Sequence, residues 1–292
     1  VVDAAKIQKD EPMKKHTTFR IGGPADYFIM PSNEKELAET IRVCREFSIP
    51  IYIVGNGSNL LVGDKGFRGA IIQLYKSMGT FQVEGNQITA QAGCSLAQIA
   101  NAALDAALTG FEFAAGIPGT LGGAVVMNAG AYGGEMKDVL TSVRVMTEEG
   151  EIMELPAEKL GLGYRTSIIP EKRYIVLGAV ISLTEGKKEE IKAQMDDLRQ
   201  KRVSKQPLEY PSAGSTFKRP EGYFAGKLIQ DSGLKGFTVG GAQVSEKHSG
   251  FVINKGNATA ADVMELIRQV TVKVKEDTGV TMEPEVKQIG EF

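Results

Sequence analysis

Two glycine-rich stretches are the parts of this sequence best suited to chemistry, because their main-chain groups could hold an anionic ligand. The first, Gly55-Asn56-Gly57-Ser58-Asn59-Leu60, directly follows the apolar run 51–54. The second runs through Gly116-Ile117-Pro118-Gly119-Thr120-Leu121-Gly122-Gly123 and continues to Asn128-Ala129-Gly130-Ala131-Tyr132-Gly133-Gly134. Consecutive small residues let successive N–H groups converge on phosphate oxygens. Two such stretches in one chain favour a ligand that carries a diphosphate.

Neither stretch has the fingerprint of the common nucleotide-binding folds. A dinucleotide-binding GxGxxG would need glycine at position 60, where this chain has Leu60. A P-loop would end in Gly-Lys-Ser/Thr, whereas Gly226-Lys227 is followed by Leu228. Taken alone, the first stretch is a tight turn about as often as a ligand loop. The glycine density of the second is better explained by close approach of the main chain to a large ligand.

Composition argues against several other classes of function. The formal net charge of −2 gives no electrostatic basis for binding nucleic acid or an anionic membrane. His16 and His248 are the only histidines, so hydrolytic triads and zinc sites are disfavoured and no metal is expected. Cys44 and Cys94 lie among apolar residues and are predicted to be buried thiols. With no signal core and no apolar run near ~20 residues, a cytoplasmic protein is expected.

Hydrophobic patterning predicts the elements that would position these stretches. Asn33 with Glu36 predicts a capping box for a helix whose apolar stripe runs from Leu37 to Phe47. The run 51–54 is apolar throughout, as in a strand buried on both faces. Further strands are expected at 25–30, 70–74 and 174–183. Two hairpins are predicted, one from strands at 81–83 and 88–90 and one from strands at 143–145 and 151–155.

Three more helices are predicted from caps and periodicity. The first is alanine-rich, begins at Ser95 and ends at Gly110. The second is amphipathic and follows a polar hinge at 186–190, with Ile191, Met195 and Leu198 on one face. The third begins at Thr259 and stops at Gly279. Changes of character near residue 76 and in the hinge divide the chain at 1–76, 77–186 and 187–292, with an α+β fold as the outcome.

An ordered series of motifs resembles the UDP-N-acetylenolpyruvoylglucosamine reductase family. Besides the two glycine stretches, the series contains Thr18-Phe19-Arg20-Ile21-Gly22-Gly23, Gly163-Tyr164-Arg165-Thr166-Ser167, Gly214-Ser215-Thr216-Phe217-Lys218-Arg219-Pro220 and Glu283-Pro284-Glu285-Val286. Each motif is weak alone, whereas the series spans about Lys14 to Gly290 and is specific. The family uses NADPH and bound FAD to reduce UDP-N-acetylglucosamine enolpyruvate to UDP-N-acetylmuramate in peptidoglycan synthesis, and the resemblance implies this reaction here.

The resemblance also implies a fold and a cofactor site. Two N-terminal subdomains of the vanillyl-alcohol-oxidase (PCMH) type would bind FAD, and a C-terminal α+β domain would cover the substrate. This layout agrees with the breaks predicted near residues 76 and 186. The residues implied for FAD are Gly55, Asn56, Gly57, Ser58, Asn59, Leu60, Gly116, Ile117, Pro118, Gly119, Thr120, Gly122, Gly123, Gly130 and, near the flavin edge, Ile175.

Three catalytic residues are carried over from the family motifs. Arg165 would stabilise the negative charge that develops on the substrate carboxylate, Ser215 would donate the proton, and Glu285 would assist at the same centre. Without the resemblance, these residues would be interpreted as a surface arginine, a turn serine and a strand-end carboxylate. The substrate-binding residues implied are Tyr132, Lys205, Lys218 and His248. For His248, a plain surface histidine is an equally good interpretation.

The spacing after Arg165 indicates the shorter, second branch of the family. Pro170 and the strand at Tyr174 follow too soon for the loop with a substrate-covering tyrosine that the other branch inserts. Arg219 stands where the other branch has asparagine. Two other functions remain open from the residues: a flavin oxidase on the same scaffold, and a flavin- or nucleotide-sugar-binding protein without turnover. For the reductase, a monomer is expected.

Overall fold

The computed structural model describes residues 2–292, which form two compact units. Unit 1 contains the chain up to Gln8 together with Phe28–Asn56 and Ala70–Arg202, and unit 2 contains Lys9–Tyr27, Gly57–Gly69 and Val203–Phe292. Neither unit is continuous in sequence, and the first glycine stretch is divided between them after Asn56. The domain division predicted at 76 and 186 is a different partition and stays a prediction.

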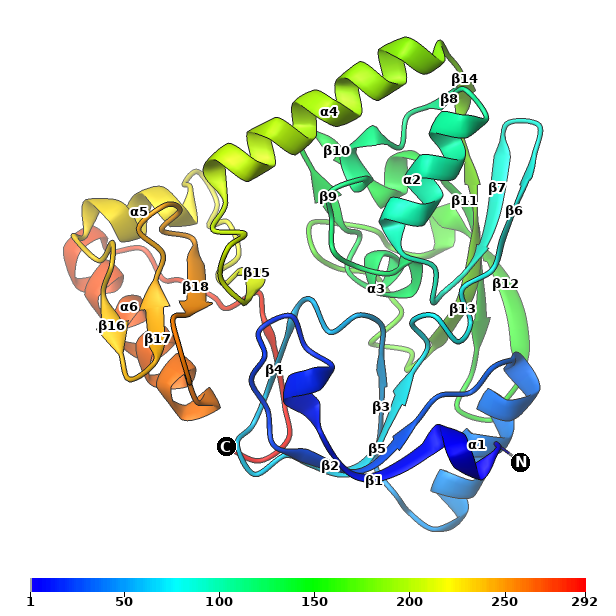
Figure 1. The fold of residues 1–292 in the computed structure, drawn as a ribbon, viewed down its shortest axis with the longest axis horizontal. Coiled ribbons are helices and arrows are strands. Elements are labelled where there is room, and N and C mark those ends of the chain that lie inside the picture. The colour runs from blue at the N-terminus through cyan, green and yellow to red at the C-terminus, as the bar shows by residue number, and fades with distance from the viewer. Residues whose placement is uncertain (1) are drawn as a thin grey trace. The chain divides into compact units, whose positions relative to one another are not determined.

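A five-stranded antiparallel sheet in the order β12-β11-β13-β7-β6 forms the centre of unit 1 (Figure 1). The middle strand, β13 (Ile175–Ser182), is buried over most of its length because strands flank it on both edges. The two predicted hairpins and the predicted strand at 174–183 are thereby confirmed. The other strands are β6 (Phe81–Glu84), β7 (Gln87–Gln91), β11 (Leu140–Met146) and β12 (Ile152–Pro156).

Three helices of unit 1 accompany this sheet. The capping box predicted at Ser95 is present at the start of α2 (Leu96–Asp105). The helix ends before the predicted stop at Gly110, because Ala107 has φ 54° and the next residues form β8 (Leu108–Thr109), which pairs with β14 (Thr184–Glu185). The second glycine stretch leads into α3 (Leu121–Val126) and then into the hairpin β9 (Gly130–Ala131) and β10 (Gly134–Glu135). The amphipathic helix is α4 (Lys188–Lys205).

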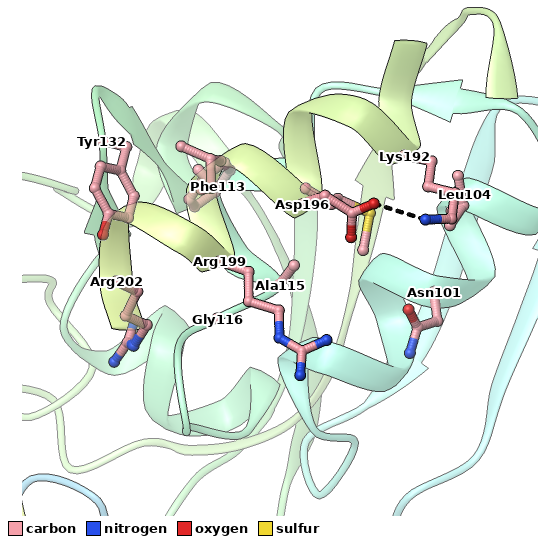
Figure 2. A pocket seen from close by; sticks show the side chains of 12 residues that line it. Asn101, Leu104, Phe113, Ala115, Gly116, Tyr132, Lys192, Asp196, Arg199 and Arg202 are labelled. Atoms are coloured by element: carbon pink, nitrogen blue, oxygen red, sulfur yellow. Dashed lines mark hydrogen bonds and ion pairs between the residues drawn. The ribbon is translucent and has the colours of Figure 1, made fainter. Parts of the chain in front are cut away.

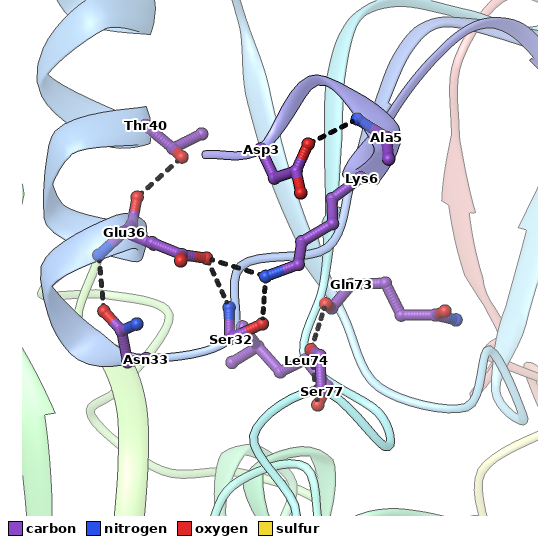
Figure 3. Close-up of polar contacts among 10 residues, drawn as sticks. All are labelled: Asp3, Ala5, Lys6, Ser32, Asn33, Glu36, Thr40, Gln73, Leu74 and Ser77. Carbon is purple, nitrogen blue, oxygen red and sulfur yellow. Dashed lines mark hydrogen bonds and ion pairs between the residues drawn. The ribbon is translucent and has the colours of Figure 1, made fainter. Parts of the chain in front are cut away.

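The first helix, α1 (Glu34–Glu46), has the predicted cap in modified form (Figure 3). The Asn33 side chain accepts from the Glu36 N–H at 2.9 Å, but the Glu36 carboxylate accepts from the Ser32 N–H at 2.8 Å, one residue earlier than in a capping box. Lys6 adds an ion pair to Glu36 at 3.5 Å. The prediction that Phe47 completes the apolar stripe is wrong: Phe47 is the C-cap residue and is 68% exposed.

The strand after α1 is β3 (Ile51–Val54), and it pairs in parallel with β5 (Phe67–Gln73). These strands belong to a four-stranded sheet in the order β1-β2-β5-β3, with β1 (Ile7–Pro12) and β2 (Pro24–Ile29). The prediction that β3 is buried on both faces is wrong, since only Val54 is fully buried. An edge position explains the exposure, because only one side of β3 is paired.

Unit 2 is built on a second antiparallel sheet, in the order β15-β18-β17-β16. Its core contains the apolar face of α6 (Ala260–Thr278) together with Phe19, Leu61 and Phe217. A separate parallel pair joins β4 (Leu60–Val62) to β19 (Lys287–Ile289). The remaining elements are β15 (Ser212–Ser215), β16 (Thr238–Val239), β17 (Ala242–Val244), β18 (Phe251–Asn254) and α5 (Ala225–Asp231).

The last helix begins and ends as predicted. Thr259 makes a capping box with Asp262, and Gly279 adopts the left-handed conformation with φ 75° at the C-cap. A second carboxylate completes the N-terminus, since Asp64 accepts from the N–H groups of Ala260 at 2.8 Å and Ala261 at 2.9 Å. The helix start is therefore tied to the chain that follows β4.

The predicted burial of both cysteines is confirmed. Cys44 and Cys94 are buried and not in a disulfide. Burial raises the pKa of the Cys94 thiol to about 11, which keeps it protonated and unreactive at neutral pH.

Replacing Asp64 by alanine should weaken the start of α6. Removing a carboxylate that accepts from two first-turn N–H groups is expected to lower the free energy of unfolding by about 1 kcal/mol. Hydrogen exchange at the Ala260 and Ala261 amides should become faster, and urea unfolding should report the loss of stability. Asp64→Asn keeps one acceptor and should lose less. Unchanged exchange in Asp64→Ala would show that the cap at Thr259 is sufficient.

Candidate active site

The start of the first glycine stretch, Gly55-Asn56, lies against the second stretch in unit 1. The Asn56 side-chain amide donates to the Pro118 carbonyl at 2.7 Å, and Gln73 donates to the Gly55 carbonyl at 3.2 Å. A Cβ atom built on Gly55 would stand 2.2 Å from Thr120 Oγ1, so only glycine fits at this position. Close approach between the stretches, and not flexibility, therefore explains this glycine.

Several main-chain donors in these stretches have no partner among residues 2–292. In unit 1, the N–H groups of Asn56, Gly119 and Thr120 make no hydrogen bond to protein, although their neighbour Leu121 donates to the Cys94 carbonyl at 2.9 Å. Gly57 and Ser58, in unit 2, likewise have N–H groups without a protein acceptor. Unpaired N–H groups in consecutive small residues suit phosphate oxygens. Within each unit, these residues thus fit phosphate oxygens such as those of the FAD diphosphate.

The remainder of the first stretch is held firmly within unit 2. Gly57 has φ 61°, and a Cβ there would meet the His16 carbonyl oxygen at 2.1 Å. The Asn59 side-chain amide donates to the Glu285 carbonyl at 3.2 Å. The main-chain carbonyl of Asn59 accepts from the Lys287 N–H at 3.0 Å. Leu60 is 3% exposed and pairs with Lys287 at the start of β4. One predicted cofactor residue, Asn59, is thereby bonded to a predicted catalytic residue, Glu285, and to Lys287 two positions later.

Asn128 organises the end of the second stretch. Its side chain is fully buried and donates to the Glu135 carboxylate at 2.8 Å and the Gly163 carbonyl at 3.0 Å, while accepting from the Lys137 N–H at 2.9 Å. The Asn128 amide thus joins the segment at 135–137 to the loop that contains Gly163. The left-handed backbone of Asn128, with φ 42°, shows that these bonds outweigh an unfavourable conformation.

Arg165 lies directly beyond the Gly163 carbonyl that Asn128 binds. Its backbone is also left-handed, with φ 53°, and its side chain is half-buried. The guanidinium donates to the Gly130 carbonyl at 3.2 Å and stands 5.1 Å from the centre of the Tyr164 ring. A strained residue held by its surroundings is a frequent feature of active sites.

Ser215 and Glu285 are brought together in unit 2 through Thr216. The buried Thr216 donates its N–H to the Gly250 carbonyl at 2.8 Å and accepts from the Val252 N–H at its hydroxyl at 2.9 Å. Its carbonyl accepts from the Glu285 N–H at 2.7 Å. Ser215 itself is exposed at the end of β15. The main chains carrying the serine and the carboxylate are therefore fixed to each other.

The three predicted catalytic residues are divided between the units. Arg165 belongs to unit 1, whereas Ser215 and Glu285 belong to unit 2. The structure thus places two of the three on adjacent segments of one unit. Of the other cofactor residues, Gly130 begins β9 beside Arg165, and Ile175 is buried at the first position of β13.

The predicted substrate residues are placed in different ways. Tyr132 is 47% exposed and left-handed with φ 54°, and Lys205 is exposed at the end of α4. Lys218 is paired with Glu283 at 3.0 Å. His248 is half-buried, and burial lowers its pKa. Its Nδ1 accepts from the Gly250 N–H at 3.1 Å, which leaves Nε2 as the protonated nitrogen of the neutral ring.

A cavity of about 430 Å³ lies beside α4 in unit 1 (Figure 2). Its apolar lining comes from α4, α2 and the segment before Gly116, while Arg199 and Arg202 project from α4. Gly116 and Tyr132, both predicted ligand residues, also line it.

Sequence reasoning missed Asn128, Thr216 and Arg202. Asn128 and Thr216 stood inside recognised motifs, but their hydrogen bonds reach loops far away in the chain. Arg202 had a visible signal, since it continues the face of α4 marked by Ile191, Met195 and Leu198, where a cation is unexpected. Across residues 2–292 we find no group of metal-ligating side chains, and no helix of sufficient length and apolarity to span a membrane.

Asn128→Ala should destabilise unit 1. The substitution leaves Glu135 and the Gly163 carbonyl without their buried donor, which predicts a loss of about 3 kcal/mol in the free energy of unfolding. Asn128→Gly relieves the left-handed backbone and should be less damaging by roughly 1 kcal/mol. Urea unfolding of both variants measures the difference. A wild-type midpoint for Asn128→Ala would contradict the organising role of this side chain.

Two segments of the chain match known protein families. Residues 25–156 match the FAD binding domain, and residues 206–289 match the UDP-N-acetylenolpyruvoylglucosamine reductase, C-terminal domain. Phl p 4, a grass pollen allergen with glucose dehydrogenase activity, is 15% identical with a TM-score of 0.51 over 63% of this chain and 42% of its own, and shares only the fold.

Curated relatives are similar over nearly the full length. UDP-N-acetylenolpyruvoylglucosamine reductase of Agathobacter rectalis is 57% identical over 98% of this chain and 95% of its own, and that of Caldanaerobacter subterraneus subsp. tengcongensis is 56% identical over 100% and 96%. The crystal structure of the Thermus caldophilus reductase is 37% identical, with a TM-score of 0.83 over 97% of this chain and 98% of its own. The predicted α+β fold, with an FAD-binding module and a C-terminal domain, is confirmed. The chain belongs to the UDP-N-acetylenolpyruvoylglucosamine reductase family.

Proposed function

We propose that this protein uses NADPH and bound FAD to reduce UDP-N-acetylglucosamine enolpyruvate to UDP-N-acetylmuramate in peptidoglycan synthesis. Family membership supports the reaction and both cofactors. The observation that carries the assignment to particular residues is the network joining Asn59, Glu285 and Thr216 in unit 2. It links a cofactor loop to the segments bearing the proton donor and its carboxylate.

FAD would be held by main-chain donors of both glycine stretches. The unpaired N–H groups of Asn56, Gly119 and Thr120 in unit 1, and of Gly57 and Ser58 in unit 2, suit its diphosphate. The bound flavin supplies hydride to the methylene carbon of the enol ether. The protein contributes the position of the reacting groups, the charge that stabilises the product of that step, and the proton.

Arg165 is assigned to the charge that develops on the substrate carboxylate. A guanidinium can donate two parallel hydrogen bonds to a carboxylate, and these strengthen as negative charge accumulates there. Its contact with the Gly130 carbonyl and its left-handed backbone limit the directions in which the side chain points. Such preorganisation lowers the cost of arranging donors during the reaction.

Ser215 is assigned as the proton donor to the carbon next to the carboxylate, with Glu285 assisting. A serine hydroxyl is a weak acid, so it needs a partner that polarises it or replaces its proton. The hydrogen bond from the Glu285 N–H to the Thr216 carbonyl holds the two segments in register. Tyr132, Lys205, Lys218 and His248 are assigned to the UDP-sugar, with Lys218 exchanging its Glu283 partner for substrate.

The remaining expectations complete the proposal. The FAD-binding subdomains would be 1–76 and 77–186, and the substrate domain 187–292. We expect the enzyme to act as a monomer in the cytoplasm, with no nucleic acid or membrane partner. A flavin oxidase without need for a UDP-sugar, and a binding protein without turnover, are the alternatives that the following experiment separates.

The two half-reactions test both the function and Ser215. Purified wild type should be yellow, and the UDP-sugar should stimulate its NADPH oxidation; flavin without this stimulation would contradict the proposal. Ser215→Ala should still be reduced by NADPH, while reoxidation by the UDP-sugar should slow by at least about 100-fold. Ser212→Ala, on the same strand, is the matched control and should keep both rates. Loss of both half-reactions in Ser215→Ala would make Ser215 structural.

Gly55→Ala should weaken flavin binding. The added Cβ would overlap Thr120 Oγ1, and overpacking of about 1–3 kcal/mol corresponds to a rise of roughly 5- to 160-fold in the Kd for FAD. Fluorescence titration of apoprotein with FAD measures this. Thr120→Ala in the Gly55→Ala background removes the overlapping oxygen and should restore much of the affinity. Gly79→Ala is the control, because its nearest neighbour would lie at 3.5 Å. Equal affinities in all variants would argue that these stretches do not hold the cofactor.

A further inference from the structure

One motif of the family series, the segment from Thr18 to Gly23, has no part in the proposed reaction. It belongs to unit 2, together with the end of the first glycine stretch and β15. Phe19 is fully buried in the core of this unit, and its carbonyl accepts from the Asn254 side chain at 3.3 Å. The Asn254 N–H also donates to the Pro211 carbonyl at 2.9 Å, so the motif is held beside the start of β15.

Thr18 binds the first glycine stretch and β15 through different groups. Its N–H donates to the Gly57 carbonyl at 3.2 Å, and its hydroxyl donates to the Ser212 carbonyl at 2.7 Å. Ser212 lies three residues before Ser215, the residue assigned to proton donation. Because the carbonyl is a main-chain group, the control variant Ser212→Ala keeps this contact.

The chain between Ser212 and Ser215 departs from regular strand pairing. In the ladder of β15 with β18, Ser212 stands opposite Ile253 and Ser215 opposite Phe251, so three steps along β15 face two along β18 (Figure 1). Gly214, inside this bulge, is left-handed with φ 77°. A β-bulge re-aims the side chains next to it and disrupts the ladder locally. The direction of the Ser215 side chain therefore depends on the contacts at the two ends of the bulge.

Hydrogen bonds hold the bulge at both ends. After it, the Thr216 N–H donates to the Gly250 carbonyl at 2.8 Å, and the Thr216 carbonyl accepts from the Glu285 N–H at 2.7 Å. Before it, the half-buried Thr18 donates its hydroxyl to the Ser212 carbonyl, which would lose a partner if the hydroxyl were removed. The Thr18 side chain thus has the same part before the bulge that Thr216 has after it.

We infer that Thr18 is a positioning residue of the proposed reaction, which acts through Ser215 and not on the substrate itself. The inference rests on the proposed function, which assigns proton donation to Ser215. Displacement of a reacting group by about 1 Å can slow a step about 100-fold, so the loss of a contact three residues from the proton donor has a measurable effect. Since its N–H binds the Gly57 carbonyl, Thr18 also fixes β15 relative to the first glycine stretch.

Variants of similar shape in the full holoenzyme test this role. Thr18→Val removes the hydroxyl and keeps the N–H that binds Gly57, whereas Thr18→Ser retains the hydroxyl. Thr17→Val is the matched control, because the buried Thr17 hydroxyl donates to the Ile21 carbonyl at 3.1 Å, within the same segment. Flavin absorbance would follow reduction by NADPH and reoxidation by the UDP-sugar, and urea unfolding would compare the stabilities of the variants.

We expect reoxidation of Thr18→Val at saturating UDP-sugar to be about tenfold slower than in wild type, while reduction by NADPH and the Kd for FAD stay within about threefold. Thr18→Ser should recover most of the rate. Thr17→Val should keep the wild-type rate, although its urea midpoint falls by a similar amount. A wild-type rate in Thr18→Val, or equal slowing of both half-reactions, would overturn the inference.

A double variant tests whether Thr18 acts through Ser215. In the Ser215→Ala background, Thr18→Val should slow reoxidation by less than about threefold more, because a residue that acts through another loses its effect when that partner is removed. A further slowing of about tenfold in this background would show that Thr18 acts by another route.

Hydrogen exchange tests the contact without turnover. The Ser215 and Thr216 amides should exchange faster in Thr18→Val than in wild type, and those of Thr17→Val should match wild type. Unchanged exchange in Thr18→Val would contradict the inference. Failure of the proposed function has a different signature, since wild-type holoenzyme would then not be reoxidised by the UDP-sugar, while the exchange result would still decide whether Thr18 holds β15.

Discussion

The hydrogen bonds that join Asn59 to the Glu285 carbonyl and the Lys287 N–H are the constraint on which the arrangement in unit 2 depends. They attach the end of the first glycine stretch to the segment at 285–287, which is more than two hundred residues away in sequence. Once that segment is fixed, the Glu285 N–H meets the Thr216 carbonyl and Ser215 follows at the end of β15. The end of the first glycine stretch, the segment with Glu285 and the end of β15 with Ser215 are thus parts of one hydrogen-bonded structure.

In unit 1, the loops that carry the predicted site residues are held by strained backbone conformations and a buried side-chain amide. Asn128, Tyr132 and Arg165 all adopt left-handed backbones, which non-glycine residues rarely occupy. The bonds of Asn128 to Glu135 and Gly163 supply the compensation, and they set the direction of the chain just before Arg165. The buried Asn128 amide therefore stabilises the loop that leads into Arg165, which we propose meets the substrate carboxylate.

Much of this fold could be predicted from the sequence because its signals are local. The caps at Ser95 and Thr259, the stop at Gly279 and the two hairpins depend on residues within a few positions of each other. Phe47 could not be placed in this way, because apolar periodicity does not show where a helix ends. The pairing of β4 with β19 was likewise out of reach, since it depends on contacts between distant segments.

In the candidate site, too, residues within local motifs could be predicted from the sequence, whereas contacts between distant segments could not. Ser215, Glu285 and Arg165 were identified by motifs, but what holds them was not, because Thr216 and Asn128 act through main-chain partners that no motif specifies. Arg202 departs from the sequence pattern in another way. It continues the face of α4 marked by Ile191, Met195 and Leu198 and is half-buried there, where apolar periodicity predicts an apolar side chain, so no local signal in the helix explains its charge.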